Sequence, residues 1–221
     1  MYVFFATLVI QFVGSIFYFF FLTDAAWVQP VYGATKVIMF LAPLVLMQLA
    51  FPLPSFKIAK HPIRAILTGL VSGIIMSGFI YLTFYLLRSQ FLPLAVNIAR
   101  KVDDIGIASY YLLFAIALSI IHSLFEEYFW RWYAVGGLAN YFSKQMAIFC
   151  GAIFFSLHHF VILSQFFPIT WTLLFGIAVG IGGIIWSYLY KYSNSLLAPW
   201  ISHAIVDGTL FFIGYILLGS I

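Results

Sequence analysis

The chain has 221 residues, of which 65% are hydrophobic, 21% are aromatic and only 7% are charged. Soluble domains carry about 25% charged residues, so this composition excludes a soluble globular protein and indicates an integral membrane protein. The net charge of +4 is not clustered enough to suggest nucleic-acid binding. The single cysteine, Cys150, excludes an intramolecular disulfide, and its apolar neighbours indicate a packing role.

Apolar segments of about 20 residues, the length that crosses a bilayer, follow one another along the chain. The first, residues 2–23, has no basic residue before it and no clear cleavage site after it, so we interpret it as a retained span. The other predicted spans are residues 34–53, 65–87, 109–134, 145–165, 169–190 and 196–218. The sequence therefore predicts an all-α, polytopic transmembrane helical bundle of about seven spans that forms one membrane domain, residues 1–221.

The stretch between the third and fourth predicted spans, residues 90–106, mixes apolar and charged residues. It is typical of an amphipathic helix at the membrane interface, which would make an eighth element, but an ordinary connecting loop explains it equally well. Its apolar positions are Leu92, Leu94, Ile98, Val102 and Ile105. Basic residues divide almost evenly between the two sides of the membrane, and their small excess favours a cytoplasmic N-terminus.

The fourth predicted span carries Glu126, Glu127 and Arg131 in apolar surroundings. Charged groups at membrane depth are costly, so they usually face a bundle interior or a wet cavity and serve a function. Glu127 and Arg131 are four residues apart with the acid first, the favoured order for an ion pair on a helix. That pairing assigns Glu126 to a cavity, where a carboxylate can act as a general base. The alternative is that both acids pair with Arg131 and only hold helices together.

Two further predicted spans hold polar residues. His158 and His159 are adjacent in the fifth span, and neighbours on a helix point in different directions, so at most one is expected to face the same cavity as Glu126. In the last span, His203 and Asp207 are four residues apart and share a face. Independent structural pairs would be more scattered along the chain. We therefore predict one polar centre shared by the fourth, fifth and seventh spans.

Three motifs carry these residues in order: Glu126-Glu127-Tyr128-Phe129-Trp130-Arg131, Phe155-Ser156-Leu157-His158-His159 and His203-Ala204-Ile205-Val206-Asp207. They resemble EExxxR, FxxxH and HxxxN/D of the CPBP family of intramembrane proteases, which includes the type II CAAX prenyl endopeptidases and the bacterial Abi proteins. The resemblance covers about residues 109–210, which would form the catalytic core. It implies a multi-helix membrane bundle with its site recessed in the bilayer.

By this resemblance, Glu126 would activate a water for attack on a peptide carbonyl, helped by a histidine of the second motif. Both Phe154 with His158 and Phe155 with His159 satisfy FxxxH. The Phe-x-x-His-His form in similar proteins favours His159 as the catalytic histidine and leaves His158 a supporting role.

The resemblance would place His203 and Asp207 around the oxyanion or the water, with Glu127 and Arg131 as supporting residues. An ionised carboxylate cannot stabilise an oxyanion. Because asparagine is common in the family where this chain has Asp207, we expect Asp207 to orient His203 or to be protonated.

The predicted function is that of an intramembrane endopeptidase of the prokaryotic plasma membrane. It would cleave a membrane-anchored protein or peptide by a glutamate-activated water, with no metal or other cofactor. One alternative is a zinc-dependent membrane peptidase that uses His159, His203 and Glu126 or Asp207 as ligands. Others are a non-catalytic bacteriocin-immunity or scaffold protein and a proton-coupled transporter, although the paired halves or broken helices of transporters are not visible.

Aromatic residues crowd the end of the fourth predicted span: Tyr128, Phe129, Trp130, Trp132 and Tyr133. Their position at a helix end favours an interfacial belt. The alternative is the lining of an apolar substrate groove.

Overall fold

The computed structural model describes residues 2–21, 28–56 and 59–220, and no strand occurs in these ranges. Helices long and apolar enough to cross a membrane make up most of them: Tyr2–Phe21, Pro62–Leu86, Ala108–Leu138, Lys144–Leu163, Ile169–Ser193 and Leu197–Leu218. A shorter apolar helix, Gly33–Gln48, overlaps most of the predicted second span. The predicted all-α polytopic bundle of about seven spans is confirmed.

The chain folds as two compact units. Unit 1 comprises Met1–Lys57 and Phe125–Tyr188, and unit 2 comprises Ile58–Leu124 and Leu189–Ile221. Each unit is built from segments distant in sequence, so long-range packing holds each of them together. The prediction of a single membrane domain stays a prediction.

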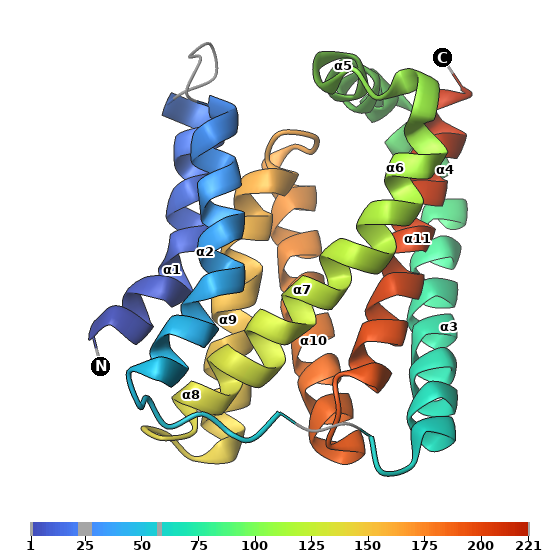
Figure 1. Ribbon diagram of the computed structural model, residues 1–221. Helices are drawn as coiled ribbons and strands as arrows, with labels where there is room; N and C mark the ends of the chain where they lie inside the picture. The colour runs from blue at the N-terminus through green and yellow to red at the C-terminus, as the bar shows by residue number, and fades with distance from the viewer. Residues whose placement is uncertain (1, 22–27, 57–58, 221) are drawn as a thin grey trace. The chain divides into compact units, whose positions relative to one another are not determined.

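Unit 1 is built around contacts of α1 with α2 and α9, and of α9 with η5 (Figure 1). Its elements are α1 (Tyr2–Ile16), η1 (Phe17–Phe21), α2 (Val28–Gln48), the end of α7 (Ser123–Glu127), η5 (Tyr128–Val135), α8 (Gly136–Leu138), α9 (Lys144–Leu163) and most of α10 (Ile169–Ser193).

Buried hydrogen bonds hold α1 in unit 1. The Gln11 amide donates to the carbonyl of Thr35 on α2 at 2.8 Å, and the hydroxyls of Thr7 and Tyr133 lie 2.6 Å apart. Polar groups inside a bilayer find no water, so they must be satisfied within the protein. These bonds therefore fix the apolar N-terminal helix against its neighbours at defined positions.

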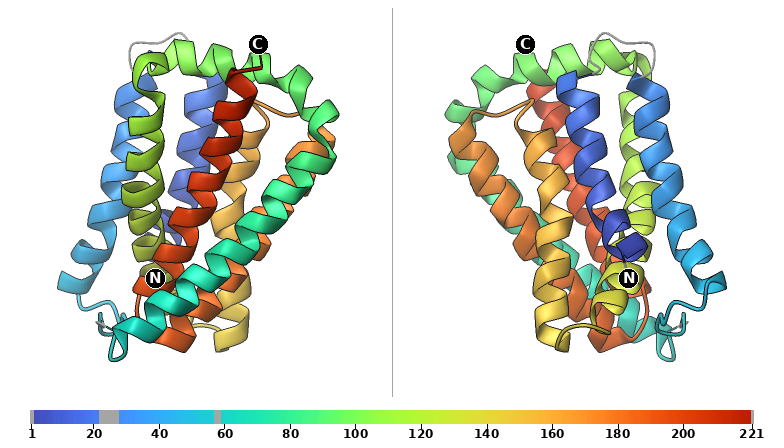
Figure 2. Two further views of the ribbon diagram at one scale, coloured as in Figure 1. Left: turned by 90° about the vertical axis from the view of Figure 1, so that its right-hand side faces the viewer. Right: turned by 90° about the vertical axis from the view of Figure 1, so that its left-hand side faces the viewer.

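Unit 2 is built around α3 and α11, which pack along each other (Figure 2). Its elements are α3 (Pro62–Leu86), α4 (Arg88–Phe91), η2 (Leu92–Leu94), α5 (Ala95–Ile105), η3 (Ala108–Tyr110), α6 (Tyr111–Ala117), η4 (Leu118–His122), the start of α7 and α11 (Leu197–Leu218).

A row of small buried residues at every fourth position lets α3 approach α11 closely. The row is Ala65, Gly69, Gly73 and Ser77. A Cβ added at Gly69 would lie 2.6 Å from the carbonyl oxygen of Ala198, a distance that no real Cβ tolerates. Lipid supplies no hydrophobic drive between membrane helices, so close backbone packing of this kind is a main source of their association.

The region 90–106 is helical, so the alternative of an ordinary loop is wrong. One face of α5 is apolar, and its Val102 packs into a buried cluster with Ile107, Tyr111 and Ala115 of the same unit. Arg100 lies on the exposed face. The amphipathic helix is thus present and covers its own unit with its apolar side; its position at the membrane interface stays a prediction.

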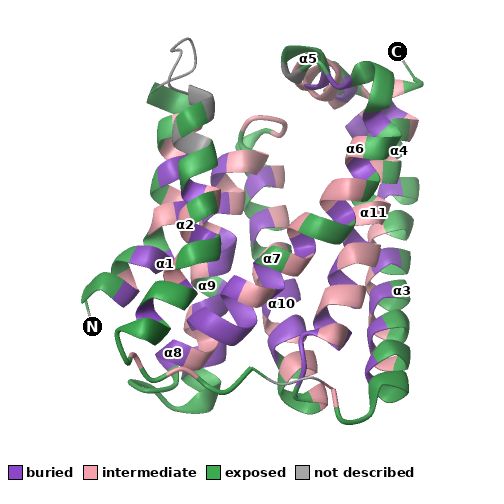
Figure 3. Ribbon diagram, in the orientation of Figure 1, coloured by how far each residue is buried: buried purple, intermediate pink, exposed green. Residues whose placement is uncertain are grey.

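The aromatic residues at the end of the fourth span are mostly buried, and η5 is coloured as buried almost throughout in Figure 3. Phe129, Trp130, Trp132 and Tyr133 are each at most 2% exposed. The interpretation as an interfacial belt is therefore wrong for these four rings. Their polar atoms and faces are covered by segments of unit 1; the Trp132 indole, for example, donates to the carbonyl of Pro54 at 2.8 Å.

We predict that Gly69→Ala lowers the free energy of unfolding by about 1–3 kcal/mol, because the new methyl group overpacks the contact of α3 with α11. Gly78→Ala on the same helix is the matched control, since a Cβ there meets nothing within 4 Å. Thermal unfolding of the detergent-solubilised variants measures both. Equal stability of the two variants would contradict the close contact.

Candidate active site

The two glutamates end α7, a short α-helical segment between two π-helical ones, η4 and η5. Sequence periodicity predicts a regular helix here. The π-helical turns change the angle between successive side chains, and such turns frequently occur at functional sites. Glu126 and Glu127 are 2% and 0% exposed, so both carboxyl groups depend on protein partners.

Arg131 is the partner of Glu127, as the spacing predicts. Its Nε donates to Glu127 Oε2 at 2.9 Å, and both side chains are fully buried. Its Nη1 donates to the carbonyl of Gly183 on α10 at 3.0 Å and lies 3.4 Å from the Ser187 hydroxyl. The guanidinium also lies over the ring of Phe155 on α9, 4.6 Å from its centroid. This one side chain therefore ties η5 to both α9 and α10.

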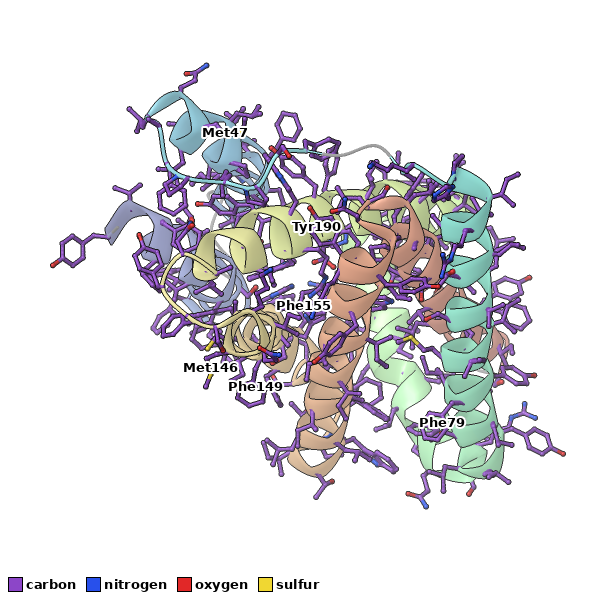
Figure 4. The ribbon with its side chains drawn as sticks, turned by 90° about the horizontal axis from the view of Figure 1, so that it is seen from below. Met47, Phe79, Met146, Phe149, Phe155 and Tyr190 are labelled. Carbon is purple, nitrogen blue, oxygen red and sulfur yellow. The ribbon has the colours of Figure 1, made fainter. Side chains whose placement is uncertain are left out.

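Phe155 lies between α9 and α10, while Met146 and Phe149 project from the opposite side of α9 (Figure 4). A Cβ at Gly183 would come within 3.1 Å of the Phe155 ring, so the glycine lets α10 pack closely against this ring. The Phe155 ring in turn contacts Trp186 at 6.0 Å between centroids. The packing of Phe155 thus sets the position of the helical turn that carries the two histidines.

Glu126 lies against the histidine pair of α9. Its Oε1 is 3.5 Å from Nε2 of His158, and both side chains are almost completely buried. The rings of His158 and His159 are 4.0 Å apart, and one donor atom of each histidine and of Glu126 all lie within 4.8 Å of one another. The structure therefore brings the predicted site residues of the fourth and fifth spans together.

The expectation that only one histidine faces Glu126 is wrong, because both imidazoles are long enough to converge on the same carboxylate. They are nevertheless not equivalent. His158 makes the direct contact with Glu126, whereas Nδ1 of the half-buried His159 lies 3.0 Å from the carbonyl oxygen of Phe155 on its own helix. The geometry thus places His158, the histidine to which the resemblance assigns a supporting role, in an ion-pair contact with Glu126.

His203 and Asp207 form the predicted pair on α11 of unit 2. Nε2 of His203 is 3.5 Å from Oδ1 of Asp207, and the histidine is almost fully buried. One turn earlier, the Trp200 indole donates to the carbonyl of Ile120 in η4 at 2.8 Å, which anchors this part of α11. The prediction of one polar centre that also includes the seventh span stays a prediction.

Comparison with known proteins identifies part of the chain. Residues 108–209 match the family model described as "Type II CAAX prenyl endopeptidase Rce1-like". This region is Rce1-like. No curated protein and no solved structure gives a match to the chain. The match covers a little less than half of the 221 residues and confirms the resemblance drawn from the three motifs.

The Rce1-like region contains every predicted site residue: Glu126, Glu127, Arg131, His158, His159, His203 and Asp207. The family is one of CAAX-type proteases, which act on membrane-associated proteins. Together with the membrane-competent helices, the match over residues 108–209 supports an integral, multi-pass membrane protein.

Sequence reasoning did not single out Trp130 of the Rce1-like region as a neighbour of the site. Its indole is parallel to the His158 ring within 8°, with 6.0 Å between the centroids. Trp130 follows Glu126 by four residues, and this spacing alone would have predicted that it lies near the carboxylate. The interpretation of these aromatic residues as an interfacial belt did not include a contact of Trp130 with the site.

Breaking the buried pair of Glu127 and Arg131 should cost stability. We predict that Glu127→Ala lowers the free energy of unfolding by about 3–5 kcal/mol, because it leaves the guanidinium buried without its carboxylate. The double variant Glu127→Leu with Arg131→Met removes both charges and should regain most of that loss. Thermal unfolding in detergent tests this. A single variant as stable as the native protein would show that the pair does not hold this region.

Proposed function

We propose that this protein is an intramembrane endopeptidase that hydrolyses a peptide bond of a membrane-associated protein or peptide, with Glu126 as the general base. The observation that carries the proposal is the contact of 3.5 Å between Glu126 Oε1 and His158 Nε2. The contact joins two membrane-competent helices of the Rce1-like region, Ala108–Leu138 and Lys144–Leu163. The family supplies the reaction class, and the burial and pairing of these side chains support the assignment of roles.

The two glutamates have different partners, which supports different tasks. Glu127 is held by Arg131 in a fully buried ion pair, 2.9 Å between Oε2 and Nε. Glu126 instead contacts an imidazole, which can exchange or share a proton with it. Glu126 is therefore the better candidate for a base that must accept and return a proton in each turnover.

In the proposed reaction, Glu126 takes a proton from a water molecule while the water oxygen attacks the carbonyl carbon of the peptide bond. The resulting tetrahedral intermediate carries its negative charge on the former carbonyl oxygen. Collapse of the intermediate breaks the C–N bond, and the proton on Glu126 passes to the departing nitrogen. One water is consumed, a carboxyl group and an amine are formed, and no oxidant or other co-reactant is needed.

The histidine that assists Glu126 is assigned differently by geometry and by resemblance. Nε2 of His158 lies 3.5 Å from Oε1 of Glu126 in an ion-pair contact, which supports a role for His158 in orienting the carboxylate. When Nδ1 of His159 carries the proton and donates to the Phe155 carbonyl, its Nε2 is an acceptor that can bind a water. We propose His158 as the direct partner of Glu126 and retain His159, the choice from resemblance, as the competing assignment.

His203 and Asp207 keep the role that the resemblance implies, around the oxyanion or the water. Within unit 2, the contact of Asp207 with His203 supports the expectation that the carboxylate orients the imidazole. A histidine fixed in this way can present an N–H to a developing negative charge. Their part in the reaction rests on the resemblance.

The substrate class follows from the family, whose description is that of a prenyl endopeptidase. We propose a membrane-associated protein with a prenylated C-terminus as the first substrate to test. The expected location in a prokaryotic plasma membrane makes unprenylated peptides, such as sorting-type tails, pheromones and bacteriocin leaders, the next candidates.

We predict that Glu126→Gln lowers the cleavage rate by about 10²–10⁴-fold, because the amide cannot accept the proton of water. The first assay is cleavage of a fluorogenic farnesylated CAAX peptide by the protein in liposomes, with an unprenylated peptide of the same sequence as control. Quantitative terminal proteomics of membranes from cells that express the native chain or the variant extends it to other substrates. Cleavage by the variant at the native rate, or no difference in either assay, would overturn the proposal.

The two histidines can be separated by matched variants. We predict that His158→Gln lowers kcat more than His159→Gln, by about tenfold or more, since Nε2 of His158 lies 3.5 Å from Oε1 of Glu126. Thermal unfolding of both variants controls for loss of structure. A larger kcat loss in His159→Gln would restore the assignment from resemblance.

A zinc peptidase is the second candidate function, and one observation favours it. Donor atoms of Glu126, His158 and His159 lie within 4.8 Å of one another. Zinc binds such ligands at about 2.0–2.1 Å, and three protein ligands with a water complete a catalytic site. Loss of cleavage with a chelator and its recovery with added zinc would select this function over the glutamate-based one.

A further inference from the structure

The indole of Trp130 packs against His158, the histidine that contacts Glu126. Trp130 is fully buried, and its indole is parallel to the His158 imidazole within 8° at 6.0 Å between centroids, the offset-stacked arrangement of aromatic pairs. The rings of Phe129 and Phe155 pack edge-to-face with the indole, with centroids 4.9 Å and 5.8 Å away. These contacts hold the indole of Trp130 in one position.

The packed indole restricts the rotation of the His158 imidazole. The χ2 torsion of histidine has broad minima, so an imidazole turns easily unless its faces are packed. The contact with Glu126 needs Nε2 on one particular side of the ring. Because Trp130 follows Glu126 by four residues in the same continuous helix, that helix supplies both the carboxylate and the surface that aligns its partner.

The indole N–H of Trp130 is a second part of the argument. It is buried, and among the described residues it has no hydrogen-bond partner. A buried donor without a partner costs free energy, and phenylalanine would avoid this cost while keeping an aromatic face. Trp132 makes the contrast, because its indole N–H donates to the carbonyl of Pro54 at 2.8 Å. This donor is covered by protein, so a group of the substrate or a water reaches it only when neighbouring side chains move aside.

We propose that Trp130 is a further residue of this site: the face of its indole positions His158, and its N–H donates to the substrate carbonyl or to the attacking water. The positioning by the indole face is independent of the reaction. The role of the N–H rests on the proposed function. The two parts are separable by substitution, because phenylalanine keeps a ring without the N–H and leucine keeps neither.

The experiment compares Trp130→Phe and Trp130→Leu with Trp132→Phe as the matched control, all in the full chain in detergent. Long-range ¹H–¹⁵N NMR of histidine-labelled protein reports which ring nitrogen of His158 carries the proton, and the loss of a signal in His158→Gln assigns it. Cleavage of the farnesylated peptide gives kcat and KM separately. Thermal unfolding confirms that each variant is folded.

We predict that the native chain and Trp130→Phe keep His158 protonated on Nε2, while Trp130→Leu gives a mixture of tautomers. We expect kcat of Trp130→Phe to fall by about tenfold to 100-fold with little change in KM, as for loss of one donor to the reacting oxygen. Trp132→Phe should lose stability along with its hydrogen bond and keep the native tautomer of His158 and a kcat near the native value.

A native tautomer in folded Trp130→Leu would overturn the positioning role. A native kcat in Trp130→Phe would overturn the donor role. If the native chain cleaves neither the peptide nor any protein in the proteomic comparison, the proposed function and the donor role fail together. The NMR measurement then still decides the positioning role, so the two failures are distinguishable.

Discussion

A fully buried arginine inside a membrane-spanning helix sets the conditions for the rest of unit 1. The guanidinium of Arg131 cannot be left in an apolar interior without compensation, since an uncompensated buried charge is strongly destabilising. Its compensation comes from three directions: the carboxylate of Glu127, the carbonyl of Gly183 and the ring of Phe155. Each partner belongs to a different element, so the contacts of this one guanidinium bring α7, α9 and α10 together.

This arrangement also sets the chemistry next to it. With Glu127 engaged by Arg131, the neighbouring Glu126 meets His158 instead, and two identical side chains acquire different surroundings. Phe155 connects the two halves of the arrangement, because its ring contacts the guanidinium while its carbonyl lies 3.0 Å from Nδ1 of His159. The ion pair thus lies one helical turn from the proposed base and its histidines, which agrees with the supporting role that we propose for it.

The distribution of apolar and small residues reflects the bilayer. Large apolar side chains such as Leu67, Val71 and Phe79 of α3 are exposed, which suits contact with lipid. The inward side of the same helix carries glycine and serine, where close approach of backbones replaces the hydrophobic effect as the source of association. The charged groups Glu126, Glu127 and Arg131 of the fourth span are buried, contrary to the pattern of soluble proteins, because inside a bilayer they find partners only within the protein.

The sequence by itself determined those features that depend on local periodicity and composition. Apolar segments of sufficient length predicted the membrane spans, and spacings of four residues predicted the contacts of Glu127 with Arg131 and of His203 with Asp207. Three motifs in order predicted the protease family that the match over residues 108–209 confirms. These features need only one helix at a time, or the order of residues along the chain.

Only the tertiary structure decided which side chains of different helices meet. It placed His158 directly against Glu126, stacked Trp130 on His158, and buried the rings that their position at a helix end had assigned to an interfacial belt. The physical reason is that such contacts depend on the rotation of each helix about its axis and on the distance between axes. In this chain, π-helical turns in the fourth span and a glycine on α10 alter both quantities, and no spacing within a single segment encodes the result.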